Sequence, residues 1–332
     1  MPRIPLVPAA SATLLLALAA EPALADPLPV NLVASLPTAP ARIRRFLVSD
    51  TPVLDVEALA PAFALAGTTE YLGDPAGPFT HHADGADHAF VFQRGGAVFH
   101  ATSILGSETK ITKRTNSQVW NSAVGLLNTL GINGYGDVYT ASRGSIGKAE
   151  VTVHNPDGTT TGPDITHQVA TYVLKLNNRT TFGAGGEIQV VYGRNGRLAA
   201  FQHGLRNLAD GGLQTCDTPS VALDRFLDRA DLDNRYNVLK NGLAAVDHAD
   251  LTAVTLGYYM PDATTWTDTL EPVYEIKGTL FGTDDLGNPQ SVDLLWYEPA
   301  IADGAIPSLG IYADPTMEPI EEPLPGELKP VD

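Results

Sequence analysis

The most constraining feature of the sequence is a pair of alternating apolar and polar runs on either side of a short turn. The runs cover Glu187–Tyr192 and Leu198–His203, and the turn between them is Arg194-Asn195-Gly196. Asn and Gly both tolerate positive φ, so this turn favours a tight hairpin. Tight turns join antiparallel strands, whereas parallel strands need a crossover of about a dozen residues or more. The segment therefore predicts an antiparallel sheet.

Helical patterns precede the groups of predicted strands. Asp55 is expected to cap a short helix that reaches Ala66 and bends near Pro61. A second helix is predicted over residues 116–130, and Thr218 with the following proline opens a third. The predicted strands are residues 89–93, 97–100, 149–154, 167–176, 187–192, 198–203, 251–260, 272–281 and 291–297. The expected fold class is therefore α+β, with repeated units of one helix packed on an antiparallel β-meander.

The N-terminal residues have the three parts of a secretory signal. Arg3 precedes an apolar run at residues 10–20, and Ala23-Leu24-Ala25 offers the small residues of a signal-peptidase site. The run is shorter than the ~20 residues that span a bilayer. We expect a secreted or periplasmic protein after cleavage near Ala25.

Changes in composition suggest how the chain is divided. The expected parts are a signal peptide (1–25), an extended leader (26–42), an N-terminal propeptide-like α+β module (43–112), a first α+β unit (113–210), a second α+β unit (211–304) and a tail rich in proline and acidic residues (305–332).

Net charge and cysteine content limit the partners and the means of stabilisation. The formal net charge is −17, and a surface of this sign repels nucleic-acid phosphates and anionic lipid. We therefore expect neither as a partner. Cys216 is the only cysteine, so no intramolecular disulfide can form and stability is expected from burial and backbone pairing.

Three stretches resemble the strands of PepSY-like and secreted-protease-propeptide-like domains. They are Phe182–Tyr192 with the following Gly196-Arg197-Leu198, Phe92–Phe99, and Leu256–Tyr259 with Leu270–Gly278. The resemblance implies a PepSY/cystatin-like fold that carries no catalytic residues. It also implies an intramolecular chaperone, an inhibitor of secreted peptidases or an extracytoplasmic binding module. No peptidase domain follows in this sequence, so the implied protein is a stand-alone binding or inhibitory one.

Three histidines and two carboxylates fall within residues 81–88. Imidazole and carboxylate suit zinc, so the candidate metal ligands are His81, His82, Asp84 and His88. Their spacing matches no standard zinc site, and neighbours in extended backbone point to opposite sides. We interpret the cluster as an exposed polar loop, with a zinc site as the alternative.

Acidic clusters at residues 228–234 and 283–288 raise the same question for calcium. Both lack the EF-hand order of ligands, so we interpret them as helix caps and turns. No cofactor is expected, with zinc or calcium as the alternatives.

Aromatic residues concentrate in the last third of the chain. On strands with an open face, Tyr259, Trp266, Tyr274 and Trp296 could stack on a sugar or clasp a peptide, and they are the candidate binding residues. Aromatic residues are common in strands, so the alternative is that they fill the core and cover sheet edges.

These observations favour an exported, non-enzymatic protein that binds a protein or peptide partner, with a secreted peptidase as one such partner. The alternative is a secreted metal-dependent hydrolase that uses the cluster at His81–His88. Nucleophile motifs give it no support, because Arg143–Gly147 lacks the first glycine of a nucleophile elbow and precedes a predicted strand.

Overall fold

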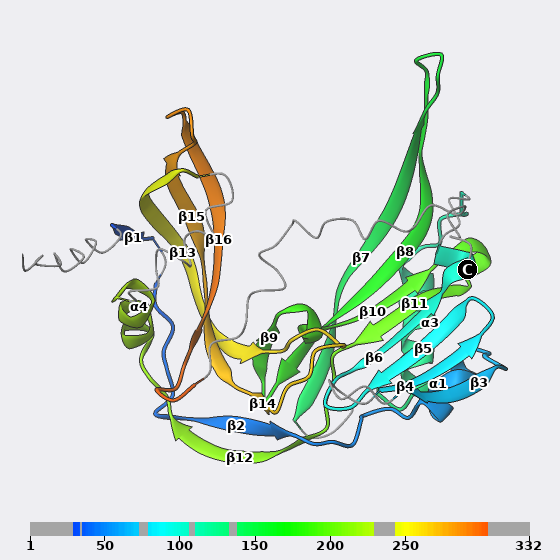
Figure 1. The fold of residues 1–332 in the computed structure, drawn as a ribbon, viewed down its shortest axis with the longest axis horizontal. Helices are drawn as coiled ribbons and strands as arrows, with labels where there is room; N and C mark the ends of the chain where they lie inside the picture. Colours follow the sequence, from blue (N-terminus) through cyan, green and yellow to red (C-terminus); the bar gives the residue numbers. More distant parts are fainter. Residues whose placement is uncertain are drawn as a thin grey trace, which may run out of the picture.

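The computed structural model describes residues 29–33, 35–72, 79–105, 110–132, 138–228 and 243–304. Strands dominate this part of the chain (Figure 1). The α-helices are α1 (Val56–Ala62), α2 (Thr102–Leu105), α3 (Asn116–Thr129) and α4 (Pro219–Asp228). The longest of these has 14 residues, whereas the two longest strands have 16 and 17.

The N-terminal half of the main sheet is antiparallel, in the order β7-β8-β10-β11-β6-β5-β4-β3. Its strands are β3 (Thr68–Leu72), β4 (Phe79–Asp84), β5 (Asp87–Phe92), β6 (Ala97–Ala101), β7 (Tyr139–His154), β8 (Thr160–Leu176), β10 (Glu187–Tyr192) and β11 (Leu198–His203). Helices α1 and α3 pack on one face of it. Phe63, which follows α1, stacks on Phe99 of β6 with ring centroids 4.1 Å apart, and Trp120 of α3 meets Tyr172 of β8 edge-on at 5.0 Å.

The C-terminal half of the sheet forms a second arm (Figure 1). Its strands are β1 (Val30–Leu32), β13 (Ala245–Tyr259), β15 (Pro272–Thr283) and β16 (Pro289–Pro299). β13, β15 and β16 pair antiparallel, and β1 adds to β13 in parallel. Helix α4 packs on this half through Phe226, whose ring lies 5.9 Å from that of Trp296.

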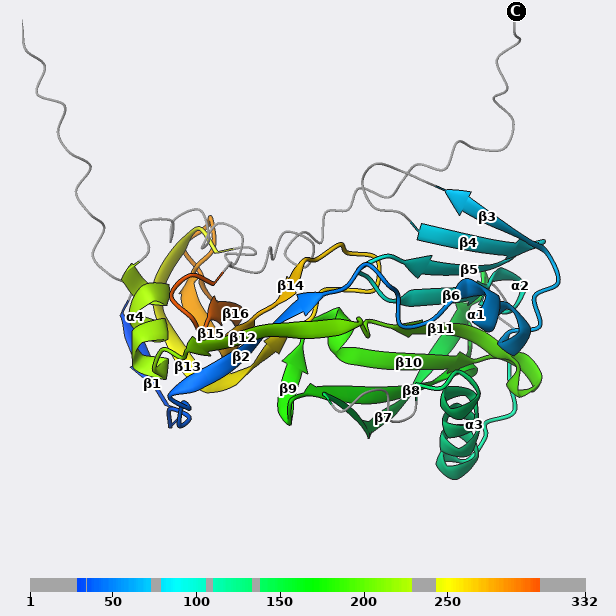
Figure 2. The same ribbon diagram turned by 90° about the horizontal axis from the view of Figure 1, so that it is seen from below.

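A short parallel pairing joins the two halves into one 13-stranded sheet. β9 (Arg179–Phe182) returns from β8 and pairs through Thr181 and Phe182 with the end of β13. A separate three-stranded sheet runs along the base in the order β12 (Leu208–Thr215), β2 (Arg42–Val48), β14 (Thr269–Leu270). Figure 2 shows β2 and β12 side by side between α4 and the N-terminal half of the sheet.

Arg206 fixes the junction between these parts from a position with no exposed surface. Its guanidinium donates hydrogen bonds to the carbonyls of Arg94, Gly204, Pro261, Asp262 and Thr265, at 2.7–3.1 Å. Burial lowers the pKa of Arg206 to about 10, which leaves it charged at neutral pH. The buried positive charge of Arg206 is therefore stabilised by the backbone carbonyls of three separate loops.

The predicted α+β fold class, with repeated units of one helix packed on its own antiparallel β-meander, is wrong, because strands dominate the described residues and helices are few. The observed sheet is continuous through β9 and β13, and β2, β12 and β14 come from three distant parts of the chain. Alternation of apolar residues shows which face of a strand is buried, but not which distant strand lies beside it. The error therefore concerns both the balance of helix and strand and the way in which the strands are assembled.

Several local predictions are confirmed. Asp55 caps α1 by accepting from the backbone N–H of Glu57 at 3.0 Å, and Pro61 lies inside that helix. The second helix begins at Asn116 as predicted, and Thr218 accepts from the backbone N–H of Val221 at the start of α4. The predicted signal peptide and C-terminal tail lie outside the described residues, and the predicted leader includes β1.

Candidate functional site

The histidine cluster forms the β4–β5 hairpin, so the predicted exposed loop is instead paired strand on both sides of a turn. Alternation places His82, which is buried, on the face opposite to His81. Nε2 of His81 lies 3.0 Å from Nδ1 of His88 across the hairpin. Asp84 accepts from the backbone N–H of Ala66 at 3.0 Å. Of the four predicted ligands, the structure therefore brings together only His81 and His88.

The described residues contain no group of three or more His, Cys, Asp or Glu side chains that could hold a metal ion. His81 and His88 instead belong to a row of rings on the face of the sheet away from α1. His81 stacks on Phe90 with ring centroids 4.5 Å apart, and Phe79 lies 5.6 Å from Phe92. Burial and the nearby His88 lower the pKa of His100, the next histidine on this face. All of these rings except that of His100 are half-buried.

The four predicted aromatic binding residues do not form one surface. Tyr259, Tyr274 and Trp296 are buried, whereas Trp266 is 40% exposed. The Arg94 guanidinium lies 4.9 Å from the centroid of the Trp266 ring, and the indole N–H donates to Asp268 at 3.2 Å. Of the predicted set, Trp266 alone is open to a ligand.

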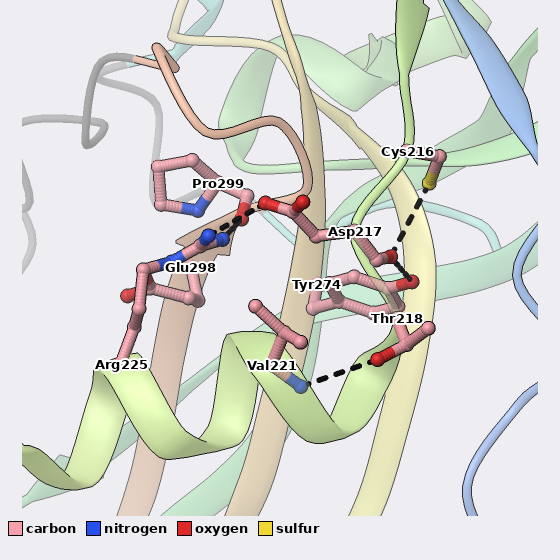
Figure 3. Close-up of polar contacts among 8 residues, drawn as sticks. All are labelled: Cys216, Asp217, Thr218, Val221, Arg225, Tyr274, Glu298 and Pro299. Atoms are coloured by element: carbon pink, nitrogen blue, oxygen red, sulfur yellow. Dashed lines mark hydrogen bonds and ion pairs between the residues drawn. The ribbon is translucent and has the colours of Figure 1, made fainter.

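Tyr274 belongs to a partly buried polar network that holds α4 on the sheet (Figure 3). Trp296 joins this network by donating its indole N–H to Glu298 at 3.2 Å. Arg225 of α4 donates to Asp217 at 2.6 Å, to Glu298 at 3.2 Å and to the Pro299 carbonyl at 2.6 Å. The Tyr274 hydroxyl donates to the carbonyl of Asp217 at 2.8 Å. This network ties α4 to β15 and β16.

Cys216 lies at the edge of the same network. Its Sγ is 3.5 Å from the carbonyl of Asp217. Burial raises the pKa of the thiol, an effect that the Tyr274 hydroxyl partly opposes. Cys216 is therefore protonated at neutral pH, and the site does not activate it as a nucleophile.

A pocket of about 570 Å³ opens where the segment before α3 meets the turn between β10 and β11. Its lining includes Lys110, Lys113, Arg114 and Arg194, and no carboxylate among the described residues lines it. We call it the basic pocket. Four cations on one pocket stand out in a chain with a net charge of −17.

The wall that carries Lys110, Lys113 and Arg114 is held against β8 by backbone pairing. The N–H of Ile111 donates to the carbonyl of Ile165 at 2.9 Å. Next along the chain, Thr115 and Gln118 form a capping box at the start of α3, with the Gln118 N–H donating to Thr115 Oγ1 at 3.3 Å. The capping box and the strand pairing therefore fix both ends of this wall.

The opposite wall is the β10–β11 turn. Asn195 and Gly196 have φ values of 57° and 68°, which explains the Asn-Gly pair in the sequence. A Cβ at Gly196 would come within 3.3 Å of Nη1 of Arg114, so the two walls meet at this glycine. Sequence reasoning found the turn but missed its place in a pocket.

Two of the four cations are already engaged. Lys110 pairs with Asp164 at 2.5 Å. Arg114 donates to the Ser122 hydroxyl at 2.5 Å and lies 5.2 Å from the centroid of the Tyr192 ring. Among the described residues, neither Lys113 nor Arg194 pairs with a carboxylate, and both are exposed. These two side chains can therefore turn toward a bound anion.

Anions are the ligands that this arrangement can hold. Guanidinium groups make paired hydrogen bonds to carboxylate or phosphate oxygens, and lysine supplies a mobile point charge. A signal in the sequence was available: Lys110, Lys113 and Arg114 fall within five residues immediately before a helix cap.

Comparisons with known proteins leave the family open. No protein-family model and no curated protein matches the sequence. The fold is similar to the crystal structure of an uncharacterized protein from Eubacterium rectale ATCC 33656, with 10% identity and a TM-score of 0.46 over 83% of this chain and 88% of the other. The resemblance to PepSY-like domains stays a prediction.

Within the described part of the chain, no helix has the length and apolar character needed to cross a membrane.

Proposed function

We propose that the protein is an exported, non-enzymatic binding protein that holds an acidic segment of a protein or peptide partner in the basic pocket. The observation that carries this proposal is the convergence of Lys110, Lys113, Arg114 and Arg194 on one pocket. The partner supplies carboxylates, and Lys113 and Arg194 are the cations that meet them.

The charge of the rest of the chain sharpens this recognition. A chain with a net charge of −17 repels an acidic partner overall, so such a partner binds best where positive charge is concentrated. Unfavourable charge elsewhere on the surface adds specificity, because misplaced binding then costs free energy. The basic pocket offers an acidic segment four cations in one place.

The dimensions of the pocket fit more than a single small ion. Ligand sites commonly have volumes of roughly 300–1,000 Å³, and the basic pocket has about 570 Å³. Its lining comes from both the segment before α3 and the β10–β11 turn, so the cations on the two walls can meet more than one carboxylate of a peptide. The zinc hydrolase alternative has no comparable support, because His82 lies on the face opposite to His81.

Binding of a dye-labelled hexaglutamate peptide tests the proposal. We expect saturable binding that weakens as salt is raised, because the contacts are exposed and screened. Replacing both free cations, Lys113→Gln with Arg194→Gln, should weaken binding about tenfold.

A matched control removes the same charge elsewhere. Arg44→Gln with Lys175→Gln changes β2 and β8 away from the pocket and should leave the affinity unchanged within about twofold. Equal loss of affinity in both double variants would show a general charge effect and would overturn the proposal. So would the absence of any binding by the unaltered protein.

A further inference from the structure

Trp266 is the most exposed of the three tryptophans in the chain, and charged side chains lie beside it. The guanidinium of Arg94 lies 4.9 Å from the centroid of the indole ring, and the indole N–H donates to Asp268 at 3.2 Å. Arg94 donates to Asp50 at 2.5 Å and also pairs with Asp268. We call these four residues the tryptophan site. None of them lines the basic pocket.

Three separate segments of the chain build the tryptophan site. Asp50 follows β2, Arg94 belongs to the turn between β5 and β6, and Trp266 lies between β13 and β14. The backbone N–H of Gly96 in the β5–β6 turn donates to the carbonyl of Ala263 at 2.8 Å. This bond ties two of the segments together close to Trp266 in the sequence. A ligand that binds there has little backbone to order.

Arg94 adopts a backbone conformation that favours glycine. Its φ is 50°, in the left-handed region, and its carbonyl accepts from Nε of Arg206 at 3.1 Å. A side chain in this region carries a cost in strain. The ion pairs of Arg94 with Asp50 and Asp268 offset little of this cost, because pairs exposed to water add little to stability. Folding alone therefore gives little reason for an arginine at this position, whereas a ligand that contacts the guanidinium gives one.

The groups of the tryptophan site match those of a sugar. An indole face offers a surface for the C–H groups on one side of a pyranose ring. Carboxylates accept hydrogen bonds from hydroxyl groups, and a guanidinium donates to them. The side chains of Asp50 and Asp268 are 65% and 68% exposed, so both can contact the hydroxyls of a bound sugar.

Charged ligands fit this site less well. Arg94 already makes the contact with the indole that a cationic ligand would make. Two carboxylates and one guanidinium give the site a net charge of −1, on a chain with a net charge of −17, which disfavours an anion. We propose that the tryptophan site binds a neutral saccharide, with a pyranose ring stacked on Trp266 and its hydroxyls bonded to Asp50 and Asp268.

Titration of saccharides into the protein, followed by tryptophan fluorescence and by calorimetry, tests the proposal. The probes are the β-1,4-linked hexasaccharides of glucose, mannose, xylose, galactose and N-acetylglucosamine. We expect at least one of them to bind saturably, with a Kd of roughly 0.1–1 mM because the site is open to water. Excess hexaglutamate should leave this Kd unchanged, since the basic pocket is a different site.

Variants locate the binding. Trp266→Ala should weaken saccharide binding about tenfold or more, and Asp50→Asn, which keeps the shape of the side chain, about threefold. Leu286→Ala is the control and should leave binding unchanged, because Leu286 is 86% exposed in the turn between β15 and β16. Urea unfolding checks that each variant is folded. If Trp266→Ala does not fold, Trp266→Phe with Asp50→Asn decides in its place.

Several results would overturn the saccharide site. One is that none of the hexasaccharides binds at concentrations up to about 10 mM. Another is that the Trp266 and Leu286 variants bind a hexasaccharide equally well. Saturable binding of decaproline, but of no saccharide, would assign Trp266 to a peptide instead. Each of these results leaves the proposed function standing, because that function depends on hexaglutamate binding at the basic pocket.

Discussion

Gln168 and Arg114 exchange two hydrogen bonds that set one wall of the basic pocket. The backbone N–H of Arg114 donates to Oε1 of Gln168 at 2.9 Å, and Nε2 of Gln168 donates to the carbonyl of Arg114 at 3.0 Å. Gln168 is 2% exposed on β8. The Gln168 side chain thus makes the two backbone hydrogen bonds that a neighbouring strand would otherwise make to the segment carrying Lys110 and Lys113.

Gln168→Leu should loosen this wall without removing any cation from the pocket. The substitution leaves the Arg114 N–H and carbonyl without their partner, which costs about 1–3 kcal/mol of unfolding free energy. We expect a lower urea midpoint and about threefold weaker hexaglutamate binding, because the cations lose their fixed positions. Gln202→Leu, on the half-buried face of β11, is the control and should leave binding unchanged. Unaltered binding in the Gln168 variant would show that the wall does not depend on this side chain.

Arg206→Lys should weaken the junction between the two halves of the sheet. Lysine has three donors in place of the planar fork that reaches five carbonyls. Buried carbonyls left without donors cost about 3–5 kcal/mol in total. Urea unfolding should show this loss, whereas Arg197→Lys, at an exposed site after the β10–β11 turn, should be neutral. Equal stability of the two variants would contradict the structural part assigned to Arg206.

Short-range signals in the sequence predicted the local elements well. The periodic apolar face of residues 116–130 predicted α3, and the structure ends that helix at Thr129, one residue before the prediction. The strand at 149–154 was predicted too short, because β7 begins at Tyr139. Most of β7 is exposed on both faces, so no alternation marked its first ten residues.

The sequence did not predict which strands pair when they are far apart along the chain. The parallel contact of β9 with β13 involves two residue pairs, and nothing in either strand specifies the other. The basic pocket has the same origin, because Arg194 approaches Lys113 only once the β10–β11 hairpin is placed beside the segment before α3. The predicted aromatic residues do not form one binding surface for a related reason. Their strands place Tyr274 and Trp296 in the interior, beside α4 and the residues just before it.

Arg225→Met should detach α4 from the sheet edge. Glu298 has no exposed surface and would lose its cationic partner, which typically costs about 3–5 kcal/mol. Adding Glu298→Gln to this variant removes the buried charge and should restore part of the loss. Urea unfolding of the two single variants and the double variant measures the coupling between the residues. If the changes in unfolding free energy of the two single variants add up to that of the double variant, the two residues have no coupling energy.

His203 makes the folded state sensitive to acid. It is 1% exposed at the end of β11, and its Nδ1 accepts from the backbone N–H of Leu205 at 3.1 Å, which leaves the ring proton on Nε2. Burial lowers the pKa of His203 to about 3, and the nearby Arg206 charge acts in the same direction. The folded protein therefore keeps this imidazole neutral at pH values where the unfolded chain protonates it.

The resulting stability is fully present above a pH of about 6.5, the ordinary pKa of histidine, and is lost as the pH falls toward 3. One proton taken up only by the unfolded chain lowers the unfolding free energy by about 1.4 kcal/mol per pH unit in this window. His203→Gln keeps an acceptor for Leu205 and removes the titration, so its unfolding free energy should fall less steeply between pH 6 and 4 by about that amount. His154→Gln, at an exposed site on β7, should keep the original slope. Parallel pH profiles for the unaltered protein and the His203 variant would show that the buried imidazole is protonated in the folded state.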